Sequence, residues 1–393
     1  MDLFHKCHSY TRVEETKNMD LYPYFKAFAG EQGPEVDYQG RKIIMIGSNN
    51  YLGLTNDPRL KEAAIDAVKK YGTCCTGSRF LNGTLDIHEE LENELAKWLG
   101  KEAVLVFGTG VLANMGVIPT LVGRNDCVIT DGHAHASIID GCRLSFGNHL
   151  KFKHNNKESL QQLLAGLDHS AGKLIVTDGV FSMGGDIADL PGLIDIAQKN
   201  SARVMIDDAH SVGVLGTNGK GTGEHFNIID KVDIIMGTLS KSFASTGAYV
   251  AASERVINYI KHFSRTLIFS ISIPPASAAV SLKALDIIKT EPERRQRLWE
   301  ITRIMQKGFR DLGFDTGPSC TPIIPVIIGD LVKTFTFAKL LFDNGIYANP
   351  VIPPAVPADK CLIRTSYMAT HTDEHLDKIL ATFKKLGRQL GII

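Results

Sequence analysis

Lys241 is the residue in this sequence with the clearest capacity for covalent chemistry. It follows an apolar run, Val232–Met236, and the small residues Gly237, Thr238 and Ser240 precede it. Small neighbours leave an amine in a cleft, and burial lowers the pKa of a lysine, as attack on a carbonyl compound requires. A solvated surface lysine is the ordinary alternative, so this segment does not decide the chemistry by itself.

A second polar cluster, Asp207–His210, follows the apolar segment Val204–Ile206. Alone, it could bind a metal or cap a helix. Together with Lys241 it fits pyridoxal 5′-phosphate (PLP), because this cofactor needs a lysine for its aldehyde and a carboxylate at its pyridine nitrogen. The carboxylate keeps that nitrogen protonated, since an opposite charge favours the charged form. The protonated ring can then draw electrons from the Cα atom of an amino acid.

A third segment, Phe107–Asn114, predicts a strand that runs into a helix and contains Gly108 and Gly110. Glycines at a helix N-terminus let backbone N–H groups approach a phosphate. The same residues match G-x-G-x-x-A, with Asp131 about 20 residues further on, which is the pattern of a dinucleotide site. An NAD-dependent oxidoreductase is therefore a competing interpretation, although it gives Lys241 no role.

Two more polar segments follow predicted strands, Asp131–Ser137 and Leu362–Ser366. One histidine of the first, His133 or His135, could stack on a cofactor ring, or either could cap the next helix. Arg364 in the second could bind a carboxylate through two hydrogen bonds, or form a structural ion pair.

These segments need a sheet that brings them together. Short apolar runs alternate with helical patterns such as Ile87–Trp98 and Lys157–Leu167, which predicts an α/β fold with a mainly parallel sheet covered on both faces. Ligands bind beyond the carboxyl ends of such strands. The predicted strands are Ala103–Phe107, Cys127–Thr130, Leu174–Asp178, Arg203–Asp207, Val232–Met236 and Ala248–Ala251.

Three parts are expected along the chain: an N-terminal arm over residues 1–58, a large PLP-binding domain over 59–282 and a small C-terminal domain over 283–393. A helical stretch over 274–313 leads into the last part, which has strands near 323–328 and 361–366 and a helix from about Asp373. The arm contains an aromatic-rich cluster, Leu21–Phe28. We expect it to pack on the body or on a partner subunit, with an acyl-chain wall or a membrane contact as the alternative.

The overall composition excludes several classes of protein. The 393 residues include 43 Lys+Arg and 43 Asp+Glu, without a basic run, so no nucleic-acid partner is expected. The seven cysteines show no CxxC spacing, which argues against a metal site and a disulfide framework. A signal peptide and an apolar run of about 18 residues are both missing. We expect a cytoplasmic protein that touches the inner face of the membrane at most peripherally.

Taken in order, these segments resemble the α-oxoamine synthase family of fold-type I PLP enzymes over nearly the whole chain. That resemblance implies a seven-stranded type of sheet in the large domain. One departure is Val111, where the family commonly has an aromatic residue after the phosphate-loop glycine. The motifs that carry the resemblance are Gly47–Leu54, Gly77–Thr84, His135–Gly141, Asp178–Met183, Asp207–His210, Gly237–Lys241 and Phe269–Pro275.

The resemblance implies catalytic roles for four residues. Lys241 binds the cofactor covalently and later serves as acid or base. Asp207 pairs with the pyridinium nitrogen, His210 hydrogen-bonds to the ring hydroxyl, and His135 stacks on the ring.

Other residues are implied in binding. The cofactor contacts are Gly110, Val111 and Thr238 at the phosphate, with Ser182 and Ser240 nearby. In a homodimer with shared active sites, Ser270 or Ser272 reaches the phosphate of the neighbouring subunit's cofactor. Asn50 and Arg364 bind the amino-acid substrate.

Within the family, the segments Arg79–His88, Leu239–Ser242, Asn349–Pro357 and Met368–Thr372 are most similar to the bacterial branch that uses L-serine and palmitoyl-CoA. This resemblance implies a decarboxylative condensation that gives 3-ketodihydrosphingosine, CoA and carbon dioxide, the first step of sphingolipid synthesis. The branch that uses glycine and acetyl-CoA is the main competitor. Alanine-using enzymes of biotin synthesis fit less well.

Overall fold

The computed structural model describes residues 2–393, and the chain forms two compact units. The larger unit is Asn49–Leu298, and the smaller unit combines Met1–Ser48 with Trp299–Ile393. This division differs from the predicted parts, 1–58, 59–282 and 283–393. Much of the expected arm belongs to the smaller unit, because β2 (Arg41–Met45) pairs in parallel with β11 (Ile346–Tyr347).

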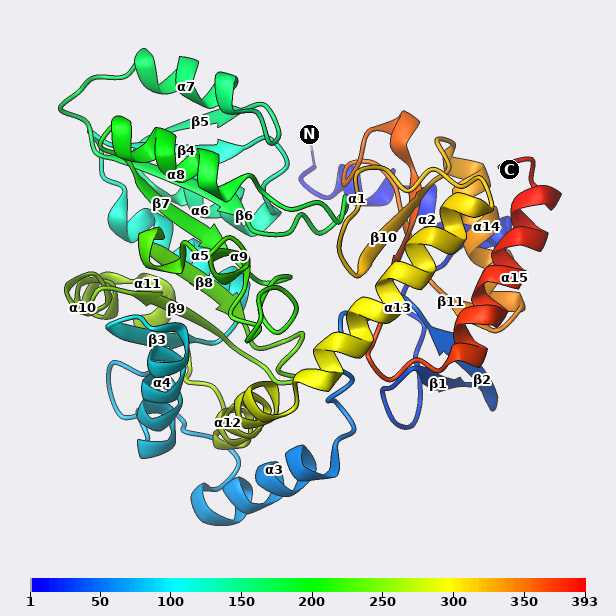
Figure 1. The fold of residues 1–393 in the computed structure, drawn as a ribbon, viewed down its shortest axis with the longest axis horizontal. Coiled ribbons are helices and arrows are strands. Elements are labelled where there is room, and N and C mark those ends of the chain that lie inside the picture. The colour runs from blue at the N-terminus through cyan, green and yellow to red at the C-terminus, as the bar shows by residue number, and fades with distance from the viewer. Residues whose placement is uncertain (1) are drawn as a thin grey trace. The chain divides into compact units, whose positions relative to one another are not determined.

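A seven-stranded sheet forms the centre of the larger unit, with the order β3-β9-β8-β7-β6-β4-β5 (Figure 1). The strands from β8 to β5 in this order pair in parallel, and β9 runs antiparallel to both β3 and β8. The predicted mainly parallel sheet is therefore confirmed. Its strands are β3 (Ala103–Phe107), β4 (Cys127–Asp131), β5 (Asn148–Phe152), β6 (Lys173–Asp178), β7 (Arg203–Asp207), β8 (Ile234–Thr238) and β9 (Ala248–Ala252).

Within the central sheet, the strand that the sequence pattern did not predict is β5. Its residues, Asn148-His149-Leu150-Lys151-Phe152, are mostly polar, and only Phe152 among them is buried. Because β5 lies at the edge of the sheet, it needs less apolar surface than the central strands. Hydrophobic periodicity could not find it for that reason.

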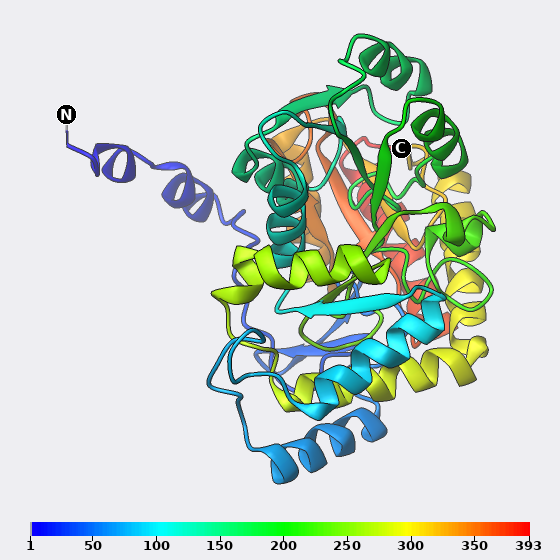
Figure 2. The same ribbon diagram turned by 90° about the vertical axis from the view of Figure 1, so that its left-hand side faces the viewer.

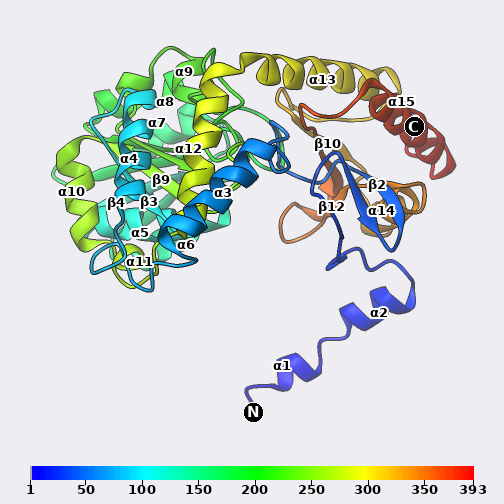
Figure 3. The same cartoon turned by 90° about the horizontal axis from the view of Figure 1, so that it is seen from below.

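Helices cover both faces of this sheet, as expected for an α/β fold. On one face, α5 (Gly110–Leu121), α6 (Ala136–Leu144), α10 (Glu254–Phe263) and α11 (Arg265–Ile268) bury apolar side chains in one core cluster with the strands. On the other side lie α7 (Lys157–Ala165) and α8 (Leu190–Lys199), as Figure 3 shows. The remaining elements of the unit are α3 (Pro58–Tyr71), α4 (Asp86–Leu99), α9 (Thr222–His225), η1 (Ile229–Lys231) and α12 (Pro275–Thr290).

The smaller unit contains two three-stranded sheets, ordered β1-β2-β11 and β10-β13-β12. The predicted strands near 323–328 and 361–366 and the helix from Asp373 are confirmed. The elements are β1 (Glu35–Tyr38), β10 (Ile323–Ile327), α14 (Leu331–Asp343), β12 (Asn349–Val351), η2 (Ala358–Lys360), β13 (Leu362–Ser366) and α15 (Asp373–Gln389).

The predicted helical stretch over 274–313 consists of two helices, α12 and α13 (Pro292–Asp311). Pro292 lacks a backbone N–H and is well suited to the first turn of a helix, so it begins α13 rather than continuing α12. Among the described residues, no helix is long and apolar enough to cross a membrane.

The aromatic-rich N-terminal cluster packs in part on its own unit. The ring of Phe28 lies 5.0 Å from that of Tyr347, and Tyr24 lies 6.3 Å from Phe335. Phe25, in contrast, is 95% exposed. The preceding helices, α1 (His5–His8) and α2 (Arg12–Asn18), bury none of their residues, and Figure 2 shows them apart from the strands of their unit.

A buried ion pair connects a loop of the larger unit to α4 and β3. Arg79 donates to the two carboxylate oxygens of Glu92 at 2.7 and 3.0 Å, and Glu92 also accepts the N–H of Val106 at 2.8 Å. Because the side chains of Arg79 and Glu92 are only 5% and 11% exposed, loss of one partner leaves a charge in a poorly solvated place.

We therefore expect Glu92→Ala to lower the free energy of unfolding by about 3–5 kcal/mol. Denaturant titration of the purified variant measures this change. The control is Glu90→Ala, an exposed position of the same helix, which should stay within about 0.5 kcal/mol of the unmodified protein. Equal stability of the two variants would contradict the expectation.

Candidate functional site

Most of the predicted site residues meet at the carboxyl ends of the parallel strands, where open α/β sheets bind ligands. A cavity of about 220 Å³ opens there within the larger unit. Strands β6, β7 and β8 end at it, and α5 and α6 begin beside it. The predicted residues that line it are Gly110, Val111, His135, Asp207, His210, Thr238, Ser240 and Lys241.

Four predicted residues of the same unit do not line this cavity. Ser182 lies in the loop after β6. Ser270 and Ser272 border a separate small hollow, where Ser272 donates to the carbonyl of Gly77 at 3.2 Å. The side chain of Asn50 shapes its own turn: it donates to Thr55 at 2.7 Å and accepts the N–H of Leu54 at 3.0 Å.

Arg364 belongs to the smaller unit. It lies on β13, opposite Pro325 of β10 and Asn349 of β12, and it is 4% exposed. The roles assigned to Arg364, Asn50, Ser182, Ser270 and Ser272 by resemblance therefore remain predictions.

Asp207 is held by two donors at the end of β7. Asn114 donates to Oδ2 at 2.8 Å, and the N–H of Ala209 donates to Oδ1 at 3.0 Å. Hydrogen bonds to a carboxylate favour its charged form and fix its direction. Asn114 was not predicted as a site residue. The sequence does contain a hint of its role, because Asn114 is a polar residue in a mostly apolar helix. In the structure it is fully buried.

His210 is oriented by Tyr51. The hydroxyl of Tyr51 lies 2.7 Å from Nδ1 of His210, and the two side chains are buried. Tyr51 belongs to the Gly47–Leu54 motif, which had received no role other than that of Asn50. A hydrogen bond at one ring nitrogen determines which way the other nitrogen points and which tautomer is present. Tyr51 is therefore part of the site through His210.

Asp178 is a second buried carboxylate beside Asp207. The two residues are directly paired in the register of β6 and β7. Burial raises the pKa of Asp178 well above its usual value, and the charge of Asp207 raises it further. Its Oδ2 accepts the N–H of His135 at 2.9 Å. The sequence placed Asp178 in a family motif but did not predict it as a site residue.

His135 begins α6 at the edge of the cavity. Its Nδ1 accepts the N–H of Ser137 at 3.2 Å and lies 2.8 Å from the hydroxyl of Ser137. The side chain therefore caps the helix, which was the plainer of the two expected roles. The same side chain lines the cavity, so an imidazole that is oriented by its capping bonds faces the space for a ligand.

The cavity also contains the features expected of a phosphate site. Helix α5 starts at Gly110, and the side chain of Thr109 accepts the N–H of Leu112 at 3.2 Å as its N-cap. The first N–H groups of a helix have no partners within the helix and attract anions. The hydroxyls of Thr238 and Ser240, 2.8 Å apart, line the same cavity. The donors at the start of α5 are backbone N–H groups, so they do not depend on the side chain of Val111.

These residues fit PLP. One cavity combines an amine at Lys241, a directed carboxylate at Asp207 and donors for a phosphate at the start of α5. A PLP molecule needs these three groups at different points of its ring.

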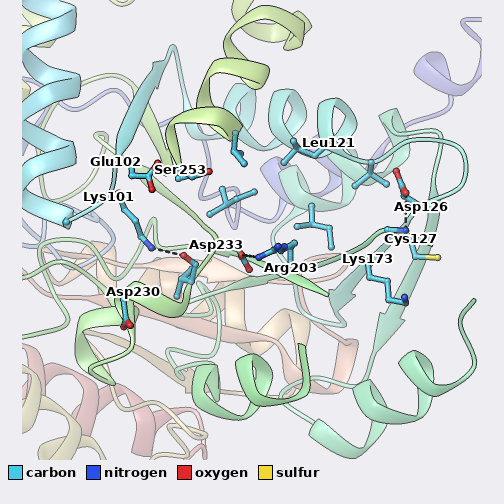
Figure 4. A pocket seen from close by; sticks show the side chains of 18 residues that line it. Lys101, Glu102, Leu121, Asp126, Cys127, Lys173, Arg203, Asp230, Asp233 and Ser253 are labelled. Carbon is cyan, nitrogen blue, oxygen red and sulfur yellow. Dashed lines mark hydrogen bonds and ion pairs between the residues drawn. The ribbon is translucent and has the colours of Figure 1, made fainter. Parts of the chain in front are cut away.

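Size alone would have identified a different place. A cavity of about 660 Å³ lies at the amino ends of the parallel strands, opposite to the carboxyl ends where the predicted residues meet (Figure 4). Its charged groups are largely satisfied within the protein: Arg203 pairs with Asp233 at 2.8 Å, and Lys101 donates to the carbonyl of Val232 at 2.7 Å. None of the predicted site residues lines it.

Residues 41–383 match the family model of class I and II aminotransferases. The chain belongs to this family. It is 51% identical to the serine palmitoyltransferase of Sphingobacterium spiritivorum, over 95% of this chain and 94% of that protein. It is 46% identical to the 8-amino-7-oxononanoate synthase of Symbiobacterium thermophilum, over 96% of each chain.

A solved structure extends this likeness to three dimensions. A serine palmitoyltransferase variant from S. paucimobilis with a bound PLP–myriocin aldimine superposes with a TM-score of 0.96, at 34% identity and over the full length of both chains. The chain is thus an α-oxoamine synthase with the fold of type I PLP transferases, and its cofactor is PLP. The dinucleotide interpretation of Gly108–Ala113 is wrong, because the cofactor is PLP and Gly110 begins α5 at the cavity that fits it.

The buried pair of carboxylates predicts a pH effect on stability. The pKa of Asp178 is raised in the folded protein, so folding favours its neutral form. That contribution is complete below the usual pKa of 3.8 and is lost as the pH rises through the raised pKa. Asp178→Asn should therefore raise the unfolding temperature of the apoenzyme at about pH 8 and leave it nearly unchanged near pH 4.

Differential scanning calorimetry of the two apoenzymes measures this difference. Asp195→Asn on α8, which removes an exposed carboxylate, is the matched control and should show no such trend. A stability gap that is the same at both pH values would argue against a protonated Asp178.

Proposed function

We propose that this PLP-dependent acyltransferase condenses L-serine with a long-chain acyl-CoA, such as palmitoyl-CoA. The products are 3-ketodihydrosphingosine, CoA and carbon dioxide, and the reaction begins sphingolipid synthesis. The observation that carries the proposal is the full-length similarity to serine palmitoyltransferases, which exceeds the similarity to the 8-amino-7-oxononanoate synthase compared above. Four segments of the sequence support the same branch: Arg79–His88, Leu239–Ser242, Asn349–Pro357 and Met368–Thr372.

When bound, PLP supplies an electron sink for the Cα atom of an amino acid. The other contributions come from the chain itself. We assign to Lys241 the covalent attachment of the cofactor and the transfer of a proton at Cα. The loop that carries Lys241 follows β8, and Asp207 is the last residue of the neighbouring β7, so both side chains line one small space. Asn114 keeps the carboxylate of Asp207 directed into it.

Orientation is the second contribution of the protein. His135, which caps α6, would lie against one face of the cofactor ring. His210, which Tyr51 orients, would donate to the hydroxyl of that ring. A bond at Cα reacts only when it stands perpendicular to the ring, since its electrons must enter the π system. Arg364 and Asn50 are proposed to bind the amino-acid carboxylate and so to fix this angle.

A homodimer with shared active sites is proposed as the working assembly. Large apolar side chains are exposed in two neighbouring segments of the larger unit: Phe80 and Leu81, at 48% and 76%, and Phe269 and Ile271, at 76% and 55%. The segments are joined by the N–H of Ser272, which donates to the carbonyl of Gly77 at 3.1 Å. Such a patch is typical of a protein interface. Ser270 or Ser272 would then reach the partner's cofactor.

The proposed reaction takes place in the cytoplasm. All seven cysteines of the chain are free thiols, as expected in a reducing compartment. Four of them, Cys75, Cys127, Cys142 and Cys361, are buried.

Lys241→Ala should abolish turnover and the absorption band of covalently bound PLP. The reason is that, among the described residues, no other amine lines the cavity to form this bond. Absorption spectra and borohydride trapping followed by mass spectrometry test this. Lys231→Ala, an exposed lysine on η1, is the control and should keep both activity and spectrum. A trapped adduct at normal stoichiometry in the Lys241 variant would refute the assignment.

The substrate pair is tested by comparing serine, glycine and alanine with acetyl-, octanoyl- and palmitoyl-CoA under matched conditions. With serine, kcat/KM should rise steeply with chain length, because each buried methylene contributes up to about 0.8 kcal/mol. Mass spectrometry identifies the aminoketone product. If glycine with acetyl-CoA, or alanine with a shorter acyl-CoA, is the most efficient pair, the sphingolipid assignment is wrong.

A further inference from the structure

A histidine outside the cavity, His154, lies between two carboxylates. Its Nδ1 is 2.9 Å from Asp131, and its Nε2 is 3.0 Å from Asp186. An ionised carboxylate only accepts hydrogen bonds, so both ring nitrogens must donate and the imidazole must carry a positive charge. Burial opposes this charge, but the two carboxylates outweigh burial and raise the pKa of His154 to about 9.

Two aromatic rings also pack against the ring of His154, whose side chain is 23% exposed. His133 stacks on it, with ring centroids 3.9 Å apart and an interplanar angle of 20°. Phe181 meets it edge-on at 4.4 Å. Burial lowers the pKa of His133, and the charge of His154 lowers it further, so the stacked pair carries a single charge. The arrangement holds His154 in one orientation.

These contacts join the loops that follow three neighbouring strands. Asp131 ends β4, His154 follows β5, and Asp186 lies in the loop after β6. Asp131 also accepts the N–H groups of His133 at 2.7 Å and of Asn155 at 2.8 Å.

The next residue strengthens the connection. Asn155 donates through its side chain to the carbonyl of Ile187 at 3.0 Å, and it accepts the N–H of Asp189 at 2.9 Å. The loop after β5, at the edge of the sheet, therefore holds the two loops nearer the cavity.

The loop after β4 is the one that carries His135. His135 lies four residues beyond Asp131, and its N–H donates to Asp178 at 2.9 Å. The loop is thus anchored at one end by the His154 cluster and at the other by Asp178. A shift at either anchor would move the imidazole that lines the cavity.

We propose that His154 is a positioning residue, which uses its contacts with Asp131 and Asp186 to hold His135 against the cofactor. The proposal rests on the proposed function only in its assignment of His135 to the PLP ring. It adds a second requirement to the site. The loop after β5 supplies no cavity residue, but it determines the geometry of the loop after β4, which supplies His135.

The test replaces His154 by glutamine in the full-length enzyme. We expect the dissociation constant of PLP to rise roughly tenfold and kcat to fall roughly tenfold to a hundredfold. Small misplacements of a positioned group have effects of this size. The visible circular dichroism of bound PLP should weaken, and the KM for serine should change little. The matched control is His149→Gln on β5, the strand that precedes His154; the ring of His149 contacts Thr130 at 2.9 Å, and its replacement should alter none of these values.

A pH profile separates the charged cluster from simple packing. The folded pKa of His154 is raised above 6.5, so its contribution to stability is complete below about 6.5 and is lost as the pH rises through about 9. The unfolding temperature of the apoenzyme should therefore exceed that of His154→Gln at neutral pH and approach it near pH 10. The charged and titratable groups facing His154 are Asp131, Asp186 and His133.

Asp186→Asn provides a second variant in case His154→Gln does not fold. It keeps the size of the side chain and removes one carboxylate, so it should weaken PLP binding less than His154→Gln does. The loss of stability at alkaline pH should also begin at a lower pH. If the variant that folds loses stability but keeps normal PLP affinity, circular dichroism and kcat, His154 is only structural and the proposal is wrong. PLP affinity and dichroism need no acyl-CoA, so they test the cluster even if another substrate pair proves correct.

Discussion

The need to satisfy buried carboxylates at the ends of parallel strands governs the active region of this enzyme. Asp131, Asp178 and Asp207 end β4, β6 and β7, and each is at most 4% exposed. A buried carboxylate is costly unless donors surround it. The donors come from the loops and helices that follow the strands: His154 for Asp131, the N–H of His135 for Asp178, and Asn114 for Asp207. The loop conformations of the site follow from these bonds.

The same constraint gives neighbouring carboxylates different surroundings. Asn114 and the N–H of Ala209 donate to the two oxygens of Asp207 and fix the direction of its carboxylate. Asp178, its neighbour in the sheet, is buried and close to the charge of Asp207, so its pKa is raised. Asp208 points elsewhere, accepts from Thr222, and has a pKa raised by burial to about 6. Three adjacent acidic residues thus have different electrostatic roles because their surroundings differ.

The site also shows why the chemistry and the choice of substrate are separate problems. The residues proposed to act on Cα line a cavity of the larger unit, at strand ends and helix starts. Arg364, the proposed carboxylate clamp, lies in the smaller unit. Likeness to relatives with two different names, a serine palmitoyltransferase and an 8-amino-7-oxononanoate synthase, is consistent with this division. Specificity would then depend on residues that surround a common reaction centre.

Much of the fold and of the site could be predicted from the sequence, because both depend on local patterns. The central strands are short apolar runs between helical patterns, and six of the seven were expected within two residues of their ends. Four predicted site residues lie at or just after the ends of such runs: His135, Asp207, His210 and Lys241. Strand ends alone therefore place them near the carboxyl ends of the strands. Their motifs, in order along the chain, resemble one family.

Tertiary structure decided what local patterns do not encode. The polar edge strand β5, the pairing of β2 with β11 and the contacts of Asn114, Tyr51 and Asp178 all join residues that are far apart in the sequence. Whether a polar side chain is buried, and which partner it meets, depends on packing between elements rather than on its neighbours in the chain. His154 is the clearest case: by sequence it is one histidine after an edge strand, and only the fold places two carboxylates at its two nitrogens.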